Sequence, residues 1–193
     1  MWEDEKGGVY GQVLDTAGNR RWTQETLLSP AGAAAFNPTV AAFADGSFLL
    51  TYSVKRANST NLWDVYARRI DAAGTGLWGQ ALRVNAADYL MYEPDLRNRP
   101  QGVVDALGYL VVAWRGDDGA GDNIFLRRFA PDGTPDWPAD LRADLTPYEI
   151  PGHFENTILS VAAGGAIYVA AAARQNDTHG IAVKKFSLNF SFR

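Results

Sequence analysis

The sequence predicts an all-β fold made of repeated four-stranded units, and three observations carry this prediction. One strand-like segment recurs three times and begins a fourth time, and each of the first three copies is followed by a glycine and a tryptophan. A second kind of segment, lying between these copies, has two apolar runs joined by a glycine turn. No segment has the apolar stripe of an amphipathic helix, because Gly32, Pro30 and Pro38 interrupt the alanine-rich stretch 31–36.

The first recurring segment alternates apolar and polar residues, as a strand does. Its four copies are Val9–Asp15, Val65–Asp71, Ile124–Phe129 and Ile181–Phe186. The first three copies lead at nearly equal intervals into Gly18 and Trp22, Gly74 and Trp78, and Gly133 and Trp137. The third copy has Ala130 in place of the turn aspartate, and the fourth has neither the glycine turn nor the tryptophan. Self-similarity at this period is typical of a repeat architecture.

The second recurring segment has the pattern of a β-hairpin. Its three copies run from Thr39 through Asp45-Gly46 to Tyr52, from Gly102 through Leu107-Gly108 to Trp114, and from Ile158 through Gly164-Gly165 to Ala170. The second run of each hairpin is almost unbroken in its apolar character, which indicates burial on both faces.

Each repeat therefore predicts four short strands, which we denote A to D. Strand A is of the Val40 type, strand B of the Phe48 type and strand C of the Tyr66 type, and strand D runs from Trp78 through Leu82 to Val84. Repeated four-stranded units of this length predict β-propeller-type blades, with the tryptophans filling the gaps between neighbouring sheets. A two-sheet sandwich is the alternative, but it does not account for the regular aspartate, glycine and tryptophan.

We expect one propeller-like domain over residues 1–193, with repeat units at about 1–36, 37–92, 93–153 and 154–193. Trp2-Glu3-Asp4 matches the end of a strand B, so the strand inventory is about three blade equivalents and one surplus strand. Because propellers usually need four or more blades, we expect an incomplete or partner-completed propeller whose unpaired edges are covered in an assembly.

The composition excludes several classes of protein. The 193 residues are 47% hydrophobic and include no cysteine, which rules out a disordered chain, a disulfide scaffold and a cysteine nucleophile. The net charge of −4 disfavours nucleic acid as a partner, and no apolar run is long enough to span a membrane. The basic residues are 14 arginines and 4 lysines, a bias that suits packed interaction surfaces.

The repeat resembles a known kind of protein. Val65-Tyr66-Ala67-x-Arg69-Ile70-Asp71-x-x-Gly74-x-x-x-Trp78, with the hairpin Pro38–Tyr52 before it, is similar to repeats of secreted bacterial β-propeller, haemolysin-type and adhesin-like surface proteins. The resemblance implies a non-enzymatic surface or binding protein and an extracytoplasmic location, with the leader outside this chain. Sialidase-type and quinoprotein-type repeats have related aspartate, glycine and tryptophan patterns, but their spacings differ.

The loop 115–123 offers a candidate metal site. It carries Asp117, Asp118 and Asp122 among glycines, and carboxylate oxygens are the ligands that calcium prefers. The spacing matches no EF-hand loop, and a solvated turn explains the same composition. We expect no cofactor other than calcium at this loop.

Three further residues are candidates for contact with a ligand or partner. Trp63 lies in a loop off the repeat pattern, where it would stack on a sugar, dock a protein or seal the edge of a blade. Arg68 and Arg127 each belong to a basic pair in strand C that recurs as Lys184-Lys185. A ring of such cations would bind acidic glycans or phosphate; we favour the interpretation that their stems pack on aromatic rings and their heads pair with aspartates between blades.

No serine, histidine and acid constellation and no pair of catalytic carboxylates stands out, and His153 and His179 are the only histidines. We therefore expect a non-enzymatic module that docks on protein partners. The alternatives are a glycan-binding, lectin-like propeller and a fragment of a propeller enzyme of the sialidase or quinoprotein type.

Overall fold

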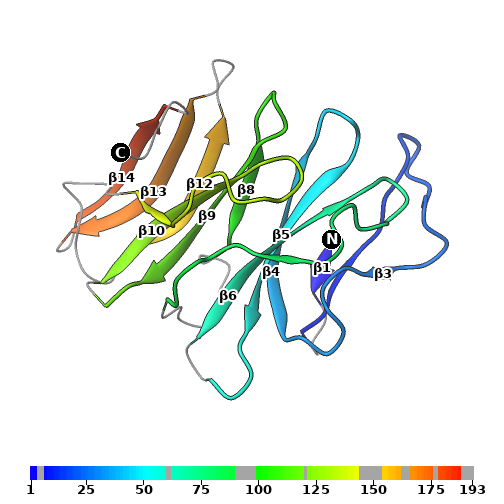
Figure 1. Cartoon of the computed structure of the whole chain (residues 1–193), viewed down its shortest axis with the longest axis horizontal. Coiled ribbons are helices and arrows are strands. Elements are labelled where there is room, and N and C mark those ends of the chain that lie inside the picture. Colours follow the sequence, from blue (N-terminus) through cyan, green and yellow to red (C-terminus); the bar gives the residue numbers. More distant parts are fainter. Residues whose placement is uncertain are drawn as a thin grey trace.

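The computed structural model describes residues 1–3, 7–59, 62–89, 99–119, 121–143, 154–161, 166–175 and 178–187. These residues form fourteen strands in four antiparallel sheets and contain no helix. The four sheets lie side by side in sequence order, as Figure 1 shows. The predicted all-β fold with propeller-type blades is therefore confirmed.

Each sheet is a simple meander in which neighbouring strands are consecutive in the chain. Sheet 1 contains β1 (Trp2–Glu3), β2 (Val9–Gly11) and β3 (Thr26–Leu27). Sheet 2 contains β4 (Ala35–Ala42), β5 (Phe48–Lys55), β6 (Trp63–Ile70) and β7 (Leu82–Arg83). Sheet 3 contains β8 (Gln101–Val104), β9 (Leu110–Asp117), β10 (Asp122–Phe129) and β11 (Leu141–Arg142). Sheet 4 contains β12 (Phe154–Val161), β13 (Ile167–Gln175) and β14 (Thr178–Phe186).

The strand order agrees with the predicted order A to D. Two strands differ from the prediction in detail: β7 in its length, and β4 in its start and register. Strand β1 pairs with β2 at the position of a strand B, as expected for Trp2 and Glu3. Strand D is shorter than predicted: β7 has only two residues, and Trp78 lies ahead of it. Strand β4 starts at Ala35, just before the unit boundary expected at residue 37, and its register shifts between Phe36 and Thr39.

The side chains of each C strand alternate between two faces, one toward the preceding sheet and one toward the next. We call these the backward face and the forward face. In β6, Tyr66 and Ile70 lie on the backward face and pack in a core with sheet 1. Val65 and Ala67 lie on the forward face and pack in a core with sheet 3. The hydrophobic cores of this protein therefore lie between successive sheets.

The turn after each C strand is built as the repeat predicts. The carboxylate of Asp71 accepts hydrogen bonds from the backbone N–H groups of Ala73 and Thr75, and Gly74 has a φ of 90° that favours glycine. In the third copy, where Ala130 replaces the aspartate, Asp132 accepts the N–H of Thr134 instead. The turn survives there because Asp132 and the glycine that follows it supply its side-chain hydrogen bond and its positive φ.

Candidate functional site

The recurring tryptophans join each sheet to the next. Trp22 Nε1 donates a hydrogen bond to the carbonyl of Ala72 at 3.0 Å, and Trp78 Nε1 donates to that of Pro131 at 3.2 Å. Trp137 is buried in the core between sheets 3 and 4. The prediction that these rings fill the gaps between neighbouring sheets is therefore confirmed.

The glycine of each turn makes room for the ring of the preceding sheet. A Cβ atom on Gly74 would lie 3.1 Å from the Trp22 ring, and one on Gly133 would lie 3.2 Å from the Trp78 ring. Gly18 has the same positive φ but no atom within 4 Å of such a Cβ. The glycine therefore serves both the turn and the contact between sheets, except in sheet 1.

Arg68 and Arg127 connect neighbouring sheets. Arg68 Nη1 donates to the carbonyl of Leu28, and Arg127 Nη1 donates to that of Val84, each at 2.9 Å. Leu28 and Val84 occupy equivalent positions, directly after strand D of the preceding sheet. Both arginines therefore lie between blades, as the favoured interpretation expects, but the expected aspartate partners between blades are wrong for them, because their inter-sheet partners are carbonyl oxygens.

The second arginine of each pair ties its own A–B turn. The Arg69 guanidinium lies 4.0 Å from the centre of the Phe43 ring and forms an ion pair with Asp45 at 2.6 Å. Arg128 lies 4.0 Å from the centre of the Tyr109 ring and pairs with Asp105 at 3.3 Å. Arg69 and Arg128 therefore lie against aromatic rings and pair with aspartates, as the packing interpretation expects. The aspartates belong to the same sheet as the arginine and not to the neighbouring one.

Trp63 is not the exposed loop residue that its place in the sequence suggests. It is the first residue of β6, is 3% exposed, and contacts the Phe36 ring edge-on with the centroids 5.6 Å apart. The prediction of a sugar-stacking or docking role is wrong for this conformation, because a buried ring offers no face to a ligand. The ring packs in the core between sheets 2 and 3, and a role in sealing the edge of a blade stays a prediction.

The acidic loop 115–123 is a β-hairpin between β9 and β10. Asp117 Oδ1 accepts hydrogen bonds from the backbone N–H groups of Gly119 and Gly121, and Asp118 pairs with Arg142 at 3.7 Å. The side chain of Asp122 lies outside the described residues. Among the described side chains, no group of three or more potential ligands could hold a metal ion. Calcium at this loop stays a prediction.

A network of charges closes the corner where β6 meets β7. The carboxylate of Asp64 accepts hydrogen bonds from Arg56 at 2.6 Å, Arg83 at 2.9 Å and Asn85 at 3.0 Å. Burial alone would raise the pKa of Asp64, but the hydrogen bonds from Arg56 and Asn85 and the charge of Arg83 outweigh it and hold the pKa below its ordinary value. The network links strands of one sheet and is a structural feature.

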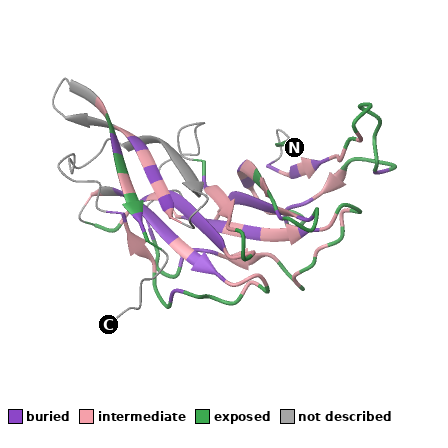
Figure 2. Cartoon of the chain, turned by 90° about the horizontal axis from the view of Figure 1, so that it is seen from above, coloured by how far each residue is buried: buried purple, intermediate pink, exposed green. Residues whose placement is uncertain are grey.

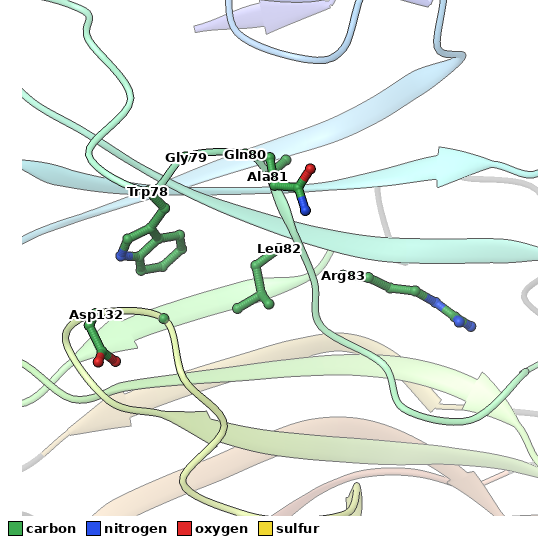
Figure 3. A pocket seen from close by; sticks show the side chains of 8 residues that line it. Trp78, Gly79, Gln80, Ala81, Leu82, Arg83 and Asp132 are labelled. Carbon is green, nitrogen blue, oxygen red and sulfur yellow. The ribbon is translucent and has the colours of Figure 1, made fainter.

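A groove of about 490 Å³ lies at the seam between sheets 2 and 3. Figure 3 shows that the segment Trp78–Arg83 forms one side and that Asp132, from the next sheet's turn, faces it. Trp78 Nε1 is bonded to Pro131, Arg83 pairs with Asp64, and Asp132 accepts from Thr134. These polar groups already have partners within the protein. We therefore interpret the groove as part of the contact between sheets 2 and 3 and not as a ligand site.

The forward face of sheet 4 differs from every other forward face. Ile181 and Val183 correspond to Ile124 and Leu126 of sheet 3, which are 2% and 0% exposed beneath sheet 4. Ile181 is 75% exposed and Val183 is 64% exposed. Figure 2 shows a strand with exposed, green stretches on the side of the molecule where the C-terminus lies. We name this surface the trailing face; it consists of Tyr168, Ala170 and Ala172 of β13 and Ile181, Val183 and Lys185 of β14.

The backward face of sheet 1 is exposed in the same way at the opposite end of the molecule. Leu14 is 56% exposed, whereas Ile70 and Phe129, at the same position of the repeat, are fully buried. Trp2 stacks on Tyr10 and is 38% exposed. We name this surface, made of Trp2, Tyr10 and Leu14, the leading face.

Sequence reasoning did not single out either face. The repeat alignment places Ile181 and Val183 at positions that are core elsewhere, and the fourth copy has no following turn or tryptophan. Those two observations together were the available signal that the fourth copy differs from the other three.

No protein-family model and no curated protein matches this chain. Among solved structures, it is similar to an endo-arabinase from Bacteroides thetaiotaomicron VPI-5482, with 11% sequence identity and a TM-score of 0.49. The similarity covers 91% of this chain and 64% of the enzyme's chain, so this chain spans less than two thirds of that protein's length. In this chain, the described residues include no helix long and apolar enough to cross a membrane.

Proposed function

We propose that this chain is a non-enzymatic interaction module that docks on a protein through the trailing face, in an extracytoplasmic assembly. The single observation that carries the proposal is the exposure of Ile181 and Val183 at positions that a neighbouring sheet covers everywhere else in the chain. An apolar face of this kind gains free energy when a partner removes it from water.

The chemistry of the trailing face suits a protein partner. The small side chains of Ala170 and Ala172 lie beside the exposed side chains of Ile181 and Val183. Tyr168 and Lys185 lie at one end of the trailing face. An apolar centre with a polar margin is the usual composition of a protein interface. Glycan binding stays a prediction.

Site-specific photo-crosslinking in the native cells tests the proposal. A photoreactive amino acid placed at position 181 or 183 should form covalent adducts with protein. The same amino acid at Leu107, which is also exposed but lies in the A–B turn of sheet 3, is the matched control and should form none. Absence of protein adducts at 181 and 183, or equal adducts at 107, would overturn the proposed function.

A further inference from the structure

By their positions in the repeat, the trailing face and the leading face correspond to the forward and the backward half of an interface that the chain forms three times internally. In each internal interface, a forward face of branched or small residues packs on the backward face of the next sheet. Val9 packs in this way in the core with Tyr52, and Val65 in the core with Trp114. Ile181 continues the series of forward residues on the trailing face.

In two of the three internal interfaces, the backward half has a stacked aromatic pair as its centre; in sheet 4 the equivalent residues are Ala171 and Ala182. The pair is Tyr52 and Tyr66 in sheet 2, with centroids 6.0 Å apart, and Trp114 and Phe125 in sheet 3, with centroids 6.1 Å apart. Sheet 1 carries the same pair as Trp2 and Tyr10, with centroids 6.4 Å apart and planes 16° from parallel. Among the described residues, no earlier sheet lies against it. The leading face therefore presents the surface that fits a forward face.

We propose that the partner of the trailing face is the leading face of a second copy of this chain, in a head-to-tail contact that repeats the internal one. Trp2 and Tyr10 of one copy would pack on Ile181 and Val183 of the other. The inference rests on the proposed function and names its partner. Two copies with four sheets each would supply eight sheets, which lies within the roughly four to eight blades of closed propellers, so the expected product is a ring of two chains.

Pairing of two β14 edges is the competing form of self-association. It would be symmetric and would use backbone hydrogen bonds of β14 in both copies. Lys184 and Lys185 lie in this strand, and lysine is a residue that natural proteins place on edge strands to prevent such pairing. The apolar positions are exposed on the face of sheet 4, which favours face-to-face packing.

Sedimentation velocity on the purified chain, over a wide range of concentration, tests the inference. We expect a species of twice the chain mass of 21.0 kDa. A trailing-face variant, Ile181→Lys with Val183→Lys, and a leading-face variant, Trp2→Glu, should each be monomeric. Leu107→Lys is the control and should remain dimeric. Leu14→Lys is a second leading-face variant, for use if Trp2→Glu lowers the urea midpoint of unfolding.

Mixing the two variants separates the head-to-tail arrangement from every other one. Each variant keeps one intact face, so an equimolar mixture should recover a dimer held by a single interface, although neither variant dimerises alone. A wild-type chain that stays monomeric, a Trp2→Glu variant that still dimerises, or a mixture that recovers nothing would each overturn the inference. Crosslinks from position 181 to a different protein would also overturn it while leaving the proposed function in place.

Discussion

Sheets 3 and 4 carry the same isoleucine at the same position of the repeat, in opposite environments. Ile124 of sheet 3 is buried by sheet 4, and Ile181 of sheet 4 is exposed. Their strands have similar sequences and the same antiparallel pairing with the preceding strand, although β10 also pairs with β11. The comparison teaches that each repeat encodes two apolar faces and that position along the arc decides which of them is covered.

The largest expected effect is a difference in the loss of stability when Ile124 and Ile181 are each replaced by alanine. Ile124→Ala should destabilise the protein by about 2–5 kcal/mol, because it removes buried methyl groups and leaves a cavity. Ile181→Ala should change the stability of the monomer by no more than about 0.5 kcal/mol. Urea unfolding at concentrations where the chain is monomeric measures both. Equal losses would show that Ile181 is buried in solution and would contradict the assignment of the trailing face.

The turn glycines allow a second comparison between a covered and an uncovered position. Gly74 of sheet 2 lies against the preceding sheet, and Gly18 of sheet 1 does not. Gly18→Ala and Gly74→Ala both place a side chain at a positive φ, which costs about 1–2 kcal/mol. Only at Gly74 does the new Cβ also press on a tryptophan of the preceding sheet, so that variant should lose about 1 kcal/mol more. Thermal or urea unfolding of the two variants checks the difference. An equal loss would mean that the Trp22 ring moves aside without cost.

The smallest expected effect is a pH dependence of stability to which Asp45 and Asp64 of sheet 2 contribute. The hydrogen bond from Ser47, aided by the charge of Arg69, holds the pKa of Asp45 below its ordinary value of 3.8, and the pKa of Asp64 is also lowered. A carboxyl group whose folded pKa is lowered contributes stability above its unfolded pKa and loses it as the pH falls. The urea midpoint should therefore decrease as the pH drops below about 4.

Asp45→Asn provides the control for this acid effect. The variant cannot lose a charge at position 45, so its midpoint should fall less than that of the wild type between neutral and acid pH. An identical decrease in both proteins would assign the acid sensitivity to other carboxyl groups.

Much of the fold could be predicted from the sequence, because the determinants are local. The alternation of Val65 to Ile70 predicts a strand, and the Asp71 turn depends on hydrogen bonds within five residues and on a glycine with positive φ. The role of Trp78 could also be predicted, since a large ring that recurs once per sheet has to be accommodated between sheets.

The candidate site could not be predicted in the same way, because burial depends on residues far away in the chain. The sequence around Trp63 predicts a loop residue, and only the contact with Phe36 in the folded chain shows that its ring is covered. Arg68 looks like a cation available to a ligand until its partner, the carbonyl of Leu28 on the preceding sheet, is known.

By itself, the sequence determined the strands, the turns and the two-faced character of each repeat, since these follow from side-chain periodicity and from the backbone preferences of glycine and aspartate. Only the tertiary structure decided which faces are covered, because covering a face requires a second sheet at packing distance. Ile124 and Ile181 are the same residue in the same repeat position, and the stacking of the sheets alone makes one of them core and the other surface.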